Sequence, residues 1–229
     1  MELLHGKYTL HLPEGAFPLS TDSMVLADFV RLSRNASVLD LGAGCGTLGL
    51  LLCAKDDHCR ITGIELDQTA HEAALDNIHR NHLTARMESI CADIKSVPDT
   101  VPSGSFSVCI SNPPYFSGGA VSTAFPTARS DEHCSLDELF RSAAWAVKYG
   151  GDFFLVHKPE RLAQICITAA RYQMEVKRLC TVQHKLSDPV SLILVQCRKG
   201  AKPGMIWESL HLREADGTPT RRYREIYHL

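Results

Sequence analysis

The sequence predicts an α/β fold: a mostly parallel seven-stranded sheet with helices on both faces. From residue 36 onward, short runs rich in β-branched residues alternate with helical patterns, as expected of parallel strands joined by crossover helices. Only the turn-forming segment 184–189 separates the last two predicted strands, so they are expected to form an antiparallel hairpin that ends the sheet. At 229 residues the chain can bury one sizeable core.

The predicted strands cover residues 36–41, 60–65, 86–91, 106–111, 152–157, 175–182 and 190–197, and the predicted helices cover 47–54, 68–82, 135–148 and 159–172. Ahead of them we expect a short strand over 8–12 and a helix over 21–32, capped by Thr21 or Asp22. Segments 207–213 and 221–227 have no predicted place in the sheet. We expect one domain, with an N-terminal lid or cap over 1–35, a catalytic core over 36–198 and a basic appendage over 199–229.

Composition narrows the class of protein. The chain is 45% hydrophobic and 22% charged, as in globular proteins, and its net charge of −2 argues against a uniformly basic nucleic-acid binder. Residues 198–229 nevertheless hold seven Lys and Arg against four acids, which indicates either contact with a polyanion or a solvated face. The nine cysteines form no C-x-x-C pair, and the chain has no signal-peptide core and no spanning apolar stretch. We therefore expect a cytoplasmic protein without disulfides or metal.

Polar residues follow four successive predicted strands. Asp40 ends the first, just before a turn containing Gly42, Gly44 and Gly46, while Glu65, Asp93 and Asn112 follow the next three. A lone acid at such a position is commonly a helix cap, but the carboxyl ends of parallel strands meet at one edge of the sheet. The sequence therefore predicts a binding site there.

The glycine turn allows two interpretations. Residues 44–49 satisfy G-x-G-x-x-G, which predicts a dinucleotide site with Glu65 on the ribose. An acid directly before the turn instead favours S-adenosylmethionine, which has no pyrophosphate to bind. In that case Glu65 would accept hydrogen bonds from both ribose hydroxyls, Asp93 would accept one from the adenine amine, and Ile94 would pack on the ring.

The segment Asn112-Pro113-Pro114-Tyr115 directly follows the strand predicted over 106–111. The lone pair of a planar amine or amide nitrogen is delocalised, and two acceptors aimed at its hydrogens return electron density to it. The side-chain oxygen of Asn112 and the carbonyl of Pro113 are candidate acceptors, and Tyr115 is a candidate stacking surface. Two prolines stiffen the turn and remove two backbone donors. The motif predicts methylation of such a nitrogen.

In this order and spacing, the turn 40–46, Glu65, Asp93 and the Asn-Pro-Pro-Tyr motif resemble those of the Rossmann-like, amino-methylating class I S-adenosylmethionine-dependent methyltransferases. Within them the chain is most similar to the bacterial tRNA (adenine-N6)-methyltransferases that act at position 37 of a valine tRNA. The closer similarity rests on segment 18–27, on the loop 115–119 that leads to Arg129, and on a body without a separate target-recognition domain.

The resemblance implies S-adenosylmethionine as cofactor and tRNA as substrate, with no metal, membrane or obligate protein partner. It implies Asn112, Pro113 and Tyr115 for catalysis. The residues implied for cofactor binding are Thr21, Asp22, Asp40, Gly42, Gly44, Gly46, Glu65, Leu66, Asp93, Ile94 and Asn112. Those implied for substrate binding are Pro114, Tyr115, Phe116, Arg129, Arg221, Arg222 and Arg224.

Three other functions compete with this one. Protein-glutamine methyltransferases of the release-factor type share the motif but usually carry a longer N-terminal helical domain, whereas about 35 residues precede the first core strand here. Ribosomal-RNA or DNA amino-methyltransferases would use the same chemistry. A non-catalytic RNA-binding module with this fold would have no use for the motif.

Overall fold

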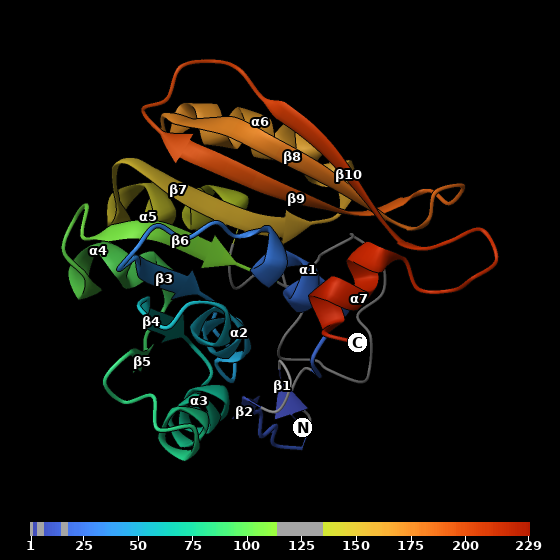
Figure 1. Ribbon diagram of the computed structural model, residues 1–229. Coiled ribbons are helices and arrows are strands. Elements are labelled where there is room, and N and C mark those ends of the chain that lie inside the picture. The colour runs from blue at the N-terminus through green and yellow to red at the C-terminus, as the bar shows by residue number, and fades with distance from the viewer. Residues whose placement is uncertain (1, 4–6, 15–17, 114–134) are drawn as a thin grey trace.

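The computed structural model describes residues 2–3, 7–14, 18–113 and 135–229, and its centre is an eight-stranded sheet (Figure 1). The strands lie in the order β10-β8-β9-β7-β6-β3-β4-β5. Their bounds are β3 Ser37–Leu41, β4 Arg60–Glu65, β5 Met87–Cys91, β6 Phe106–Ser111, β7 Val147–His157, β8 Met174–Lys185, β9 Val190–Lys199 and β10 Ile206–Arg213. A separate antiparallel pair joins β1 (Glu2–Leu3) to β2 (Tyr8–Thr9).

Strands β3 to β7 pair in parallel, and β9 runs antiparallel between β7 and β8. The predicted terminal hairpin is confirmed. The sheet has one more strand than the seven predicted, because β10 pairs in parallel with β8 at the sheet's edge. One of the two segments left without a place in the predicted sheet, 207–213, is therefore part of the sheet. Its alternation of buried and partly exposed residues extends over only the last four positions, so the sequence signal for a strand was weak.

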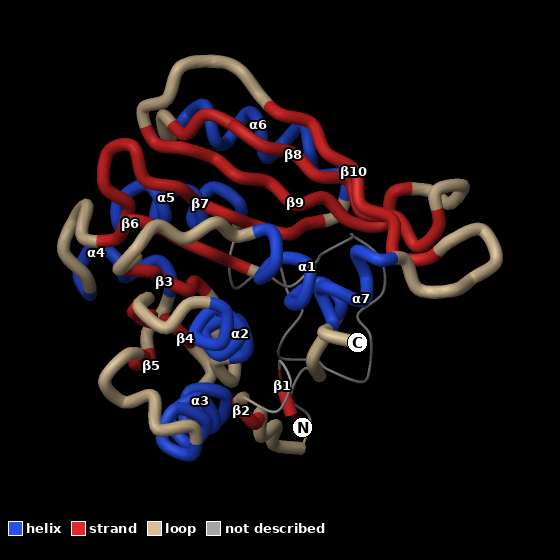
Figure 2. Tube along the Cα trace, viewed as in Figure 1, coloured by secondary structure: helices blue, strands red, loops and turns tan. Residues whose placement is uncertain are grey.

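Helices cover both faces of the sheet (Figure 2). They are α1 Thr21–Phe29, α2 Thr47–Lys55, α3 Gln68–Arg80, α4 Val97–Thr100, α5 Leu136–Ala146, α6 Leu162–Arg171 and α7 Arg221–Tyr227, with 3₁₀ turns η1 Ile94–Ser96 and η2 Pro159–Arg161. One hydrophobic core joins the sheet to α1, α2, α3 and α7, and the other joins it to α4, α5 and α6. The four predicted core helices are present, within a few residues of their predicted ends.

Side-chain caps fix where several helices begin. Asp67 accepts from the backbone N–H of Ala70 at α3, and Ser135 with Glu138 forms a capping box at α5. The predicted cap of α1 was wrong: Ser20 accepts from the N–H of Ser23, so Thr21 and Asp22 form the first turn. The helix also ends at Phe29, earlier than predicted.

Candidate active site

The polar strand ends predicted to converge come from four neighbouring strands. Their order is β6-β3-β4-β5, and Asp40 on β3 pairs with Ile110 on β6 and with Gly63 on β4. Because these strands are parallel, Asp40, Glu65 and the residues that follow β5 and β6 lie at one edge of the sheet. The predicted edge site therefore has the required topology.

Backbone hydrogen bonds hold the glycine turn against β4. The N–H groups of Gly42 and Ala43 donate to the carbonyl of Ile64 at 2.9 and 3.0 Å, and Gly44 N–H donates to Glu65 Oε2 at 2.7 Å. Gly42, Gly44 and Gly46 have φ of +75°, +55° and +82°, a conformation that residues other than glycine rarely adopt. The turn leads directly into α2.

These hydrogen bonds argue against a dinucleotide site. A pyrophosphate needs unoccupied N–H groups, but those of Gly42, Gly44 and Gly46 already donate within the protein. Gly49, the last glycine of the pattern, has a packing role, since a Cβ added there would lie 2.4 Å from the Met87 Cε atom. The carboxylate of Glu65, which binds the turn, would also repel a phosphate.

Glu65 is the carboxylate at the end of β4. Its Oε2 atom accepts from Gly44 and its Oε1 atom accepts from the N–H of Asp67 at 2.8 Å, so the side chain is held in place while partly exposed. Each carboxylate oxygen can accept a second hydrogen bond. The neighbouring Leu66 is 51% exposed and presents an apolar surface at the same edge.

Asp40 is a buried acid. Its side chain is 1% exposed, and among the described residues neither carboxylate oxygen has a hydrogen-bond partner. Burial, and secondarily the negative charge of Glu65, raise the pKa of Asp40 to about 8. A cationic ligand bound at this edge would stabilise the ionised form of the Asp40 carboxyl.

Asp93 and Ile94 follow β5. The Oδ1 atom of Asp93 accepts from the N–H of Lys95 at 2.9 Å, so this acid caps the 3₁₀ turn that follows it. The side chain remains partly exposed, and capping leaves acceptor positions on its other oxygen. Ile94 lies beside the turn, because a Cβ added to Gly42 would be 3.9 Å from the Ile94 Cδ1 atom.

Asn112 and Pro113 directly follow β6 and are both partly buried. The Nδ2 group of Asn112 donates to the hydroxyl of Ser23 on α1 at 3.1 Å. Sequence reasoning missed Ser23, since 89 residues separate the two partners. Four predicted substrate residues, Pro114, Tyr115, Phe116 and Arg129, lie outside the described residues.

The predicted lid residues Thr21 and Asp22 form the start of α1, immediately ahead of Ser23. Helix α7 packs beside α1 (Figure 1), where Tyr227 donates to Thr21 Oγ1 at 3.0 Å. The site edge therefore includes part of the C-terminal segment. This proximity could not be predicted from positions 206 residues apart.

The three predicted tail arginines differ in their surroundings. Arg222 is ion-paired with Asp28 on α1 and with Glu225, so it anchors α7. Arg221 pairs with Glu225 at 2.8 Å, although 92% of its side chain is exposed. Arg224 is exposed and makes no ion pair with the described residues. Together with Arg221 it lines a depression of about 480 Å³.

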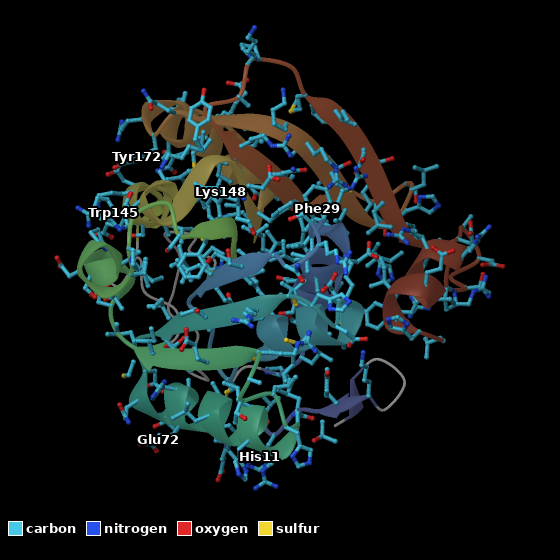
Figure 3. All side chains as sticks on the ribbon, turned by 60° about the vertical axis from the view of Figure 1, so that its left-hand side comes forward. His11, Phe29, Glu72, Trp145, Lys148 and Tyr172 are labelled. Atoms are coloured by element: carbon cyan, nitrogen blue, oxygen red, sulfur yellow. The ribbon has the colours of Figure 1, made fainter. Side chains whose placement is uncertain are left out.

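Asn77 is a further residue that supports the site. It is fully buried on α3, and its Nδ2 group donates at 2.9 Å to the carbonyls of Cys45, in the glycine turn, and of His11. Figure 3 shows His11 beside α3. An Asn on the apolar stripe that Ala73, Ala74 and Ile78 form was the available signal.

Cys45 is a small buried side chain inside the turn. Burial, followed by the charges of Glu65 and Asp67, raises the pKa of its thiol to about 11. The thiol therefore stays protonated near neutral pH and is not a nucleophile. Its role is to fill space under the turn.

A cavity of about 780 Å³ lies at the opposite edge of the sheet. Lys148, which is labelled in Figure 3, is one of its lining residues. Two of its arginines are neutralised, Arg178 by Glu208 at 2.9 Å and Arg198 by Asp152 at 2.8 Å. It holds none of the predicted site residues. The site at the carboxyl edge remains the candidate.

The residues at the carboxyl edge fit S-adenosylmethionine. Asp40 is a buried carboxyl without a partner in the described part of the chain, Glu65 offers acceptors suited to ribose hydroxyls, and Leu66 is an exposed apolar side chain. A Cβ on Gly44 would meet nothing within 4 Å, so the turn has open space beside it. Cationic, hydroxyl and aromatic parts of one ligand match these three features.

Within residues 2–3, 7–14, 18–113 and 135–229, no helix has both the length and the apolar character needed to cross a membrane. In the same residues, no group of three or more His, Cys, Asp and Glu side chains is arranged to hold a metal ion.

Comparison with known proteins gives concordant results. Residues 18–178 match the family model described as methyltransferase small domain. A predicted O-methyltransferase from Agrobacterium tumefaciens has the same fold, with a TM-score of 0.77 and 22% identity over 91% of this chain and 96% of that one.

Curated relatives share a narrower name, tRNA1(Val) (adenine(37)-N6)-methyltransferase. The Pectobacterium carotovorum protein is 30% identical over 93% of this chain and 84% of its own length. The Shewanella halifaxensis protein is 33% identical over 74% and 67%, and the Photobacterium profundum protein is 29% identical over 81% and 80%. The chain therefore belongs to the methyltransferase small domain family and, within it, to the tRNA1(Val) (adenine(37)-N6)-methyltransferases.

Proposed function

We propose that the protein methylates N6 of adenine 37 in a valine tRNA, in the cytoplasm, with S-adenosylmethionine as the methyl donor. The observation that carries the proposal is the position of Asn112. It follows β6, next to the strand whose end carries Asp40 and the glycine turn. The target adenine is the one that the names of the relatives specify.

When bound, S-adenosylmethionine supplies an electrophilic methyl group. Glu65 would hold its ribose, Asp93 and Ile94 would hold its adenine, and Asp40 with the glycine turn would bind its charged end. The arrangement of Asp40, Glu65 and Gly44 at one sheet edge supports these roles. Thr21 and Asp22, at the start of α1, contribute the lid.

Asn112 and Pro113 bind the amine that is methylated. Their two carbonyl oxygens accept the N–H hydrogens, which orients the nitrogen and increases its electron density. The base must leave its stack to reach this edge, and Tyr115, Pro114 and Phe116 are the proposed contacts for its face. The nitrogen's extra proton leaves to solvent after transfer, so no strong base is required.

The rest of the tRNA is proposed to cross α7, and Arg129 is proposed as a further contact. Arg224 and Arg221 are the tail residues suited to phosphate contact, because both are exposed and lie on the helix that packs beside α1. Arg222 supports them indirectly, by attaching α7 to Asp28.

The test is methyl transfer from radiolabelled S-adenosylmethionine to tRNA, ribosomal RNA and protein in parallel, all taken from a strain that lacks the enzyme. The expected product is N6-methyladenosine in valine tRNA, and the same tRNA with guanine at position 37 is the matched control. Label in a release factor would favour the glutamine methyltransferase, and label confined to ribosomal RNA would favour that substrate. Either result would refute the proposed target.

The role of Asn112 is tested separately. Asn112→Ala is expected to lower kcat by at least about a hundredfold, as for loss of one preorganised polar contact to the reacting group. Binding of S-adenosylmethionine, measured by calorimetry, is expected to stay within about threefold. Unchanged turnover would remove Asn112 from the mechanism.

A further inference from the structure

We propose that Ser23 is the positioning residue of the site: it fixes the orientation of the Asn112 side-chain amide. The inference rests on the proposed function, because it assigns a task to the acceptor that Asn112 supplies. The observation behind it is the hydrogen bond from Asn112 Nδ2 to Ser23 Oγ at 3.1 Å.

The orientation of an amide matters to this chemistry. An Asn side chain presents an acceptor oxygen on one side and two donor hydrogens on the other. Binding an amine requires the oxygen to face it, whereas a rotated amide would present N–H groups to the N–H groups of the substrate. Ser23 binds the Nδ2 side of Asn112, so the oxygen points away from α1.

The hydroxyl of Ser23 also lies beside the side chain that caps α1. Ser20 Oγ lies 3.4 Å from Ser23 Oγ and already accepts the backbone N–H of Ser23 at 3.3 Å. Either hydroxyl can be the donor in this contact, and in both cases Ser23 Oγ keeps a lone pair that can accept from Asn112 Nδ2. The residues that begin α1 thus also hold the acceptor of the catalytic amide in place.

Helix α1 is a firm platform for Ser23. Ser23 is 7% exposed, and its neighbours Val25 and Leu26 are fully buried. At the other end of the helix, Lys55 on α2 donates to the carbonyls of Ala27, Asp28 and Val30 at 2.9, 2.8 and 2.6 Å. A buried helix held at both ends can keep an amide in one rotamer.

The C-terminal helix adds to this platform. Arg222 binds Asp28 and Tyr227 binds Thr21, so α7 is attached near both ends of α1. Ser23 lies between these two attachment points. The helix proposed to contact tRNA is therefore bound directly to α1, the helix that carries Ser23.

The decisive variant is Ser23→Ala, which removes the acceptor and little volume. We expect kcat to fall about tenfold to a hundredfold, as for a small misplacement of a catalytic group. The Kd for S-adenosylmethionine and the KM for tRNA are expected to stay within about twofold. Ser23→Thr, which retains the hydroxyl, is expected to recover most of kcat.

Ser107→Ala is the matched control. Ser107 Oγ donates to the carbonyl of Ser37 at 3.0 Å, at the opposite end of β6. The Ser107→Ala variant loses one partly buried hydroxyl on the strand that leads to Asn112. A general effect of such a loss on the sheet would therefore appear in both the Ser107→Ala and the Ser23→Ala variants. We expect kcat of Ser107→Ala to match the unmodified protein.

Coupling between the two residues separates this inference from the proposed function. In an Asn112→Ala background, Ser23→Ala is expected to have no further effect on kcat. A kcat of Ser23→Ala equal to that of the unmodified protein, or an equal loss in both backgrounds, would overturn the positioning role. Full activity of Asn112→Ala alone would instead refute the proposed use of Asn112. If Ser23→Ala does not fold, Ser23→Cys, a weaker acceptor of similar size, provides the same comparison.

Discussion

Replacement of Asp40 by asparagine gives a prediction whose size follows from burial. The carboxyl is 1% exposed, and burial raises its pKa to about 8 from the ordinary 3.8. The folded protein therefore keeps a proton on Asp40 in a range where the unfolded chain has released it. Because the pKa is higher in the folded state, the protonated carboxyl contributes to the free energy of unfolding. This contribution is complete below about pH 4 and is lost as the pH rises towards 8.

The magnitude follows from linkage. Each pH unit between the two pKa values lowers the free energy of unfolding by about 1.4 kcal/mol. Between about pH 5 and about pH 7, the free energy of unfolding of the unmodified protein thus falls by about 2.5 kcal/mol through Asp40. The Asp40→Asn variant has no such loss. The added amide group costs about 1–3 kcal/mol for its unpaired donors, but that offset is the same at every pH.

The assay is urea unfolding of both proteins, followed by circular dichroism, at unit steps from about pH 5 to about pH 9. The difference in unfolding free energy, Asp40→Asn variant minus unmodified protein, is expected to rise to about pH 8 and then to level off. Ser142→Ala is the control: it removes a buried hydroxyl, which donates to the carbonyl of Ile94 at 2.8 Å, and no titrating group. Parallel curves for the unmodified protein and the Asp40→Asn variant would refute a protonated Asp40.

Three further changes test other parts of the structure. Gly46→Ala, at φ +82°, should cost about 1–2 kcal/mol in urea unfolding, and an unchanged midpoint would contradict the strain argument. Glu65→Gln should weaken S-adenosylmethionine binding at least about tenfold by calorimetry, whereas an unaltered Kd would remove Glu65 from the site. Arg222→Ala should lower the free energy of unfolding by up to about 1 kcal/mol, because it removes the ion pair with Asp28. Arg224→Glu should leave that free energy unchanged and flatten the salt dependence of tRNA binding. The opposite pattern would exchange the roles of the two arginines.

Local patterns gave the core of the fold. Four successive strands with polar residues after them were predictable because parallel strands joined by right-handed crossovers place consecutive carboxyl ends at one edge. The bounds of β4 and β6 agree with prediction to the residue. The place of β10 was not predicted, because which strand a short exposed segment joins depends on the free edge that the rest of the sheet leaves.

The roles of individual side chains were less predictable from the sequence than the strands were. Asp93 has the common role of a cap as well as its position at the edge, and the sequence pattern cannot separate the two. The arginines of α7 look alike in sequence, yet Arg222 is committed to Asp28 and Arg224 is not. That difference arises only when α7 is docked on α1.

The methyltransferase chemistry was readable from the chain alone, because the glycine turn, Glu65 and the Asn112 motif each lie within a few residues of a strand end, where local patterns act. The state of Asp40 and the partner of Asn112 became known only from the folded arrangement. Burial of Asp40 requires the whole sheet and its helices, and the bond to Ser23 joins segments 89 residues apart. Both depend on long-range packing, which no short stretch of sequence specifies.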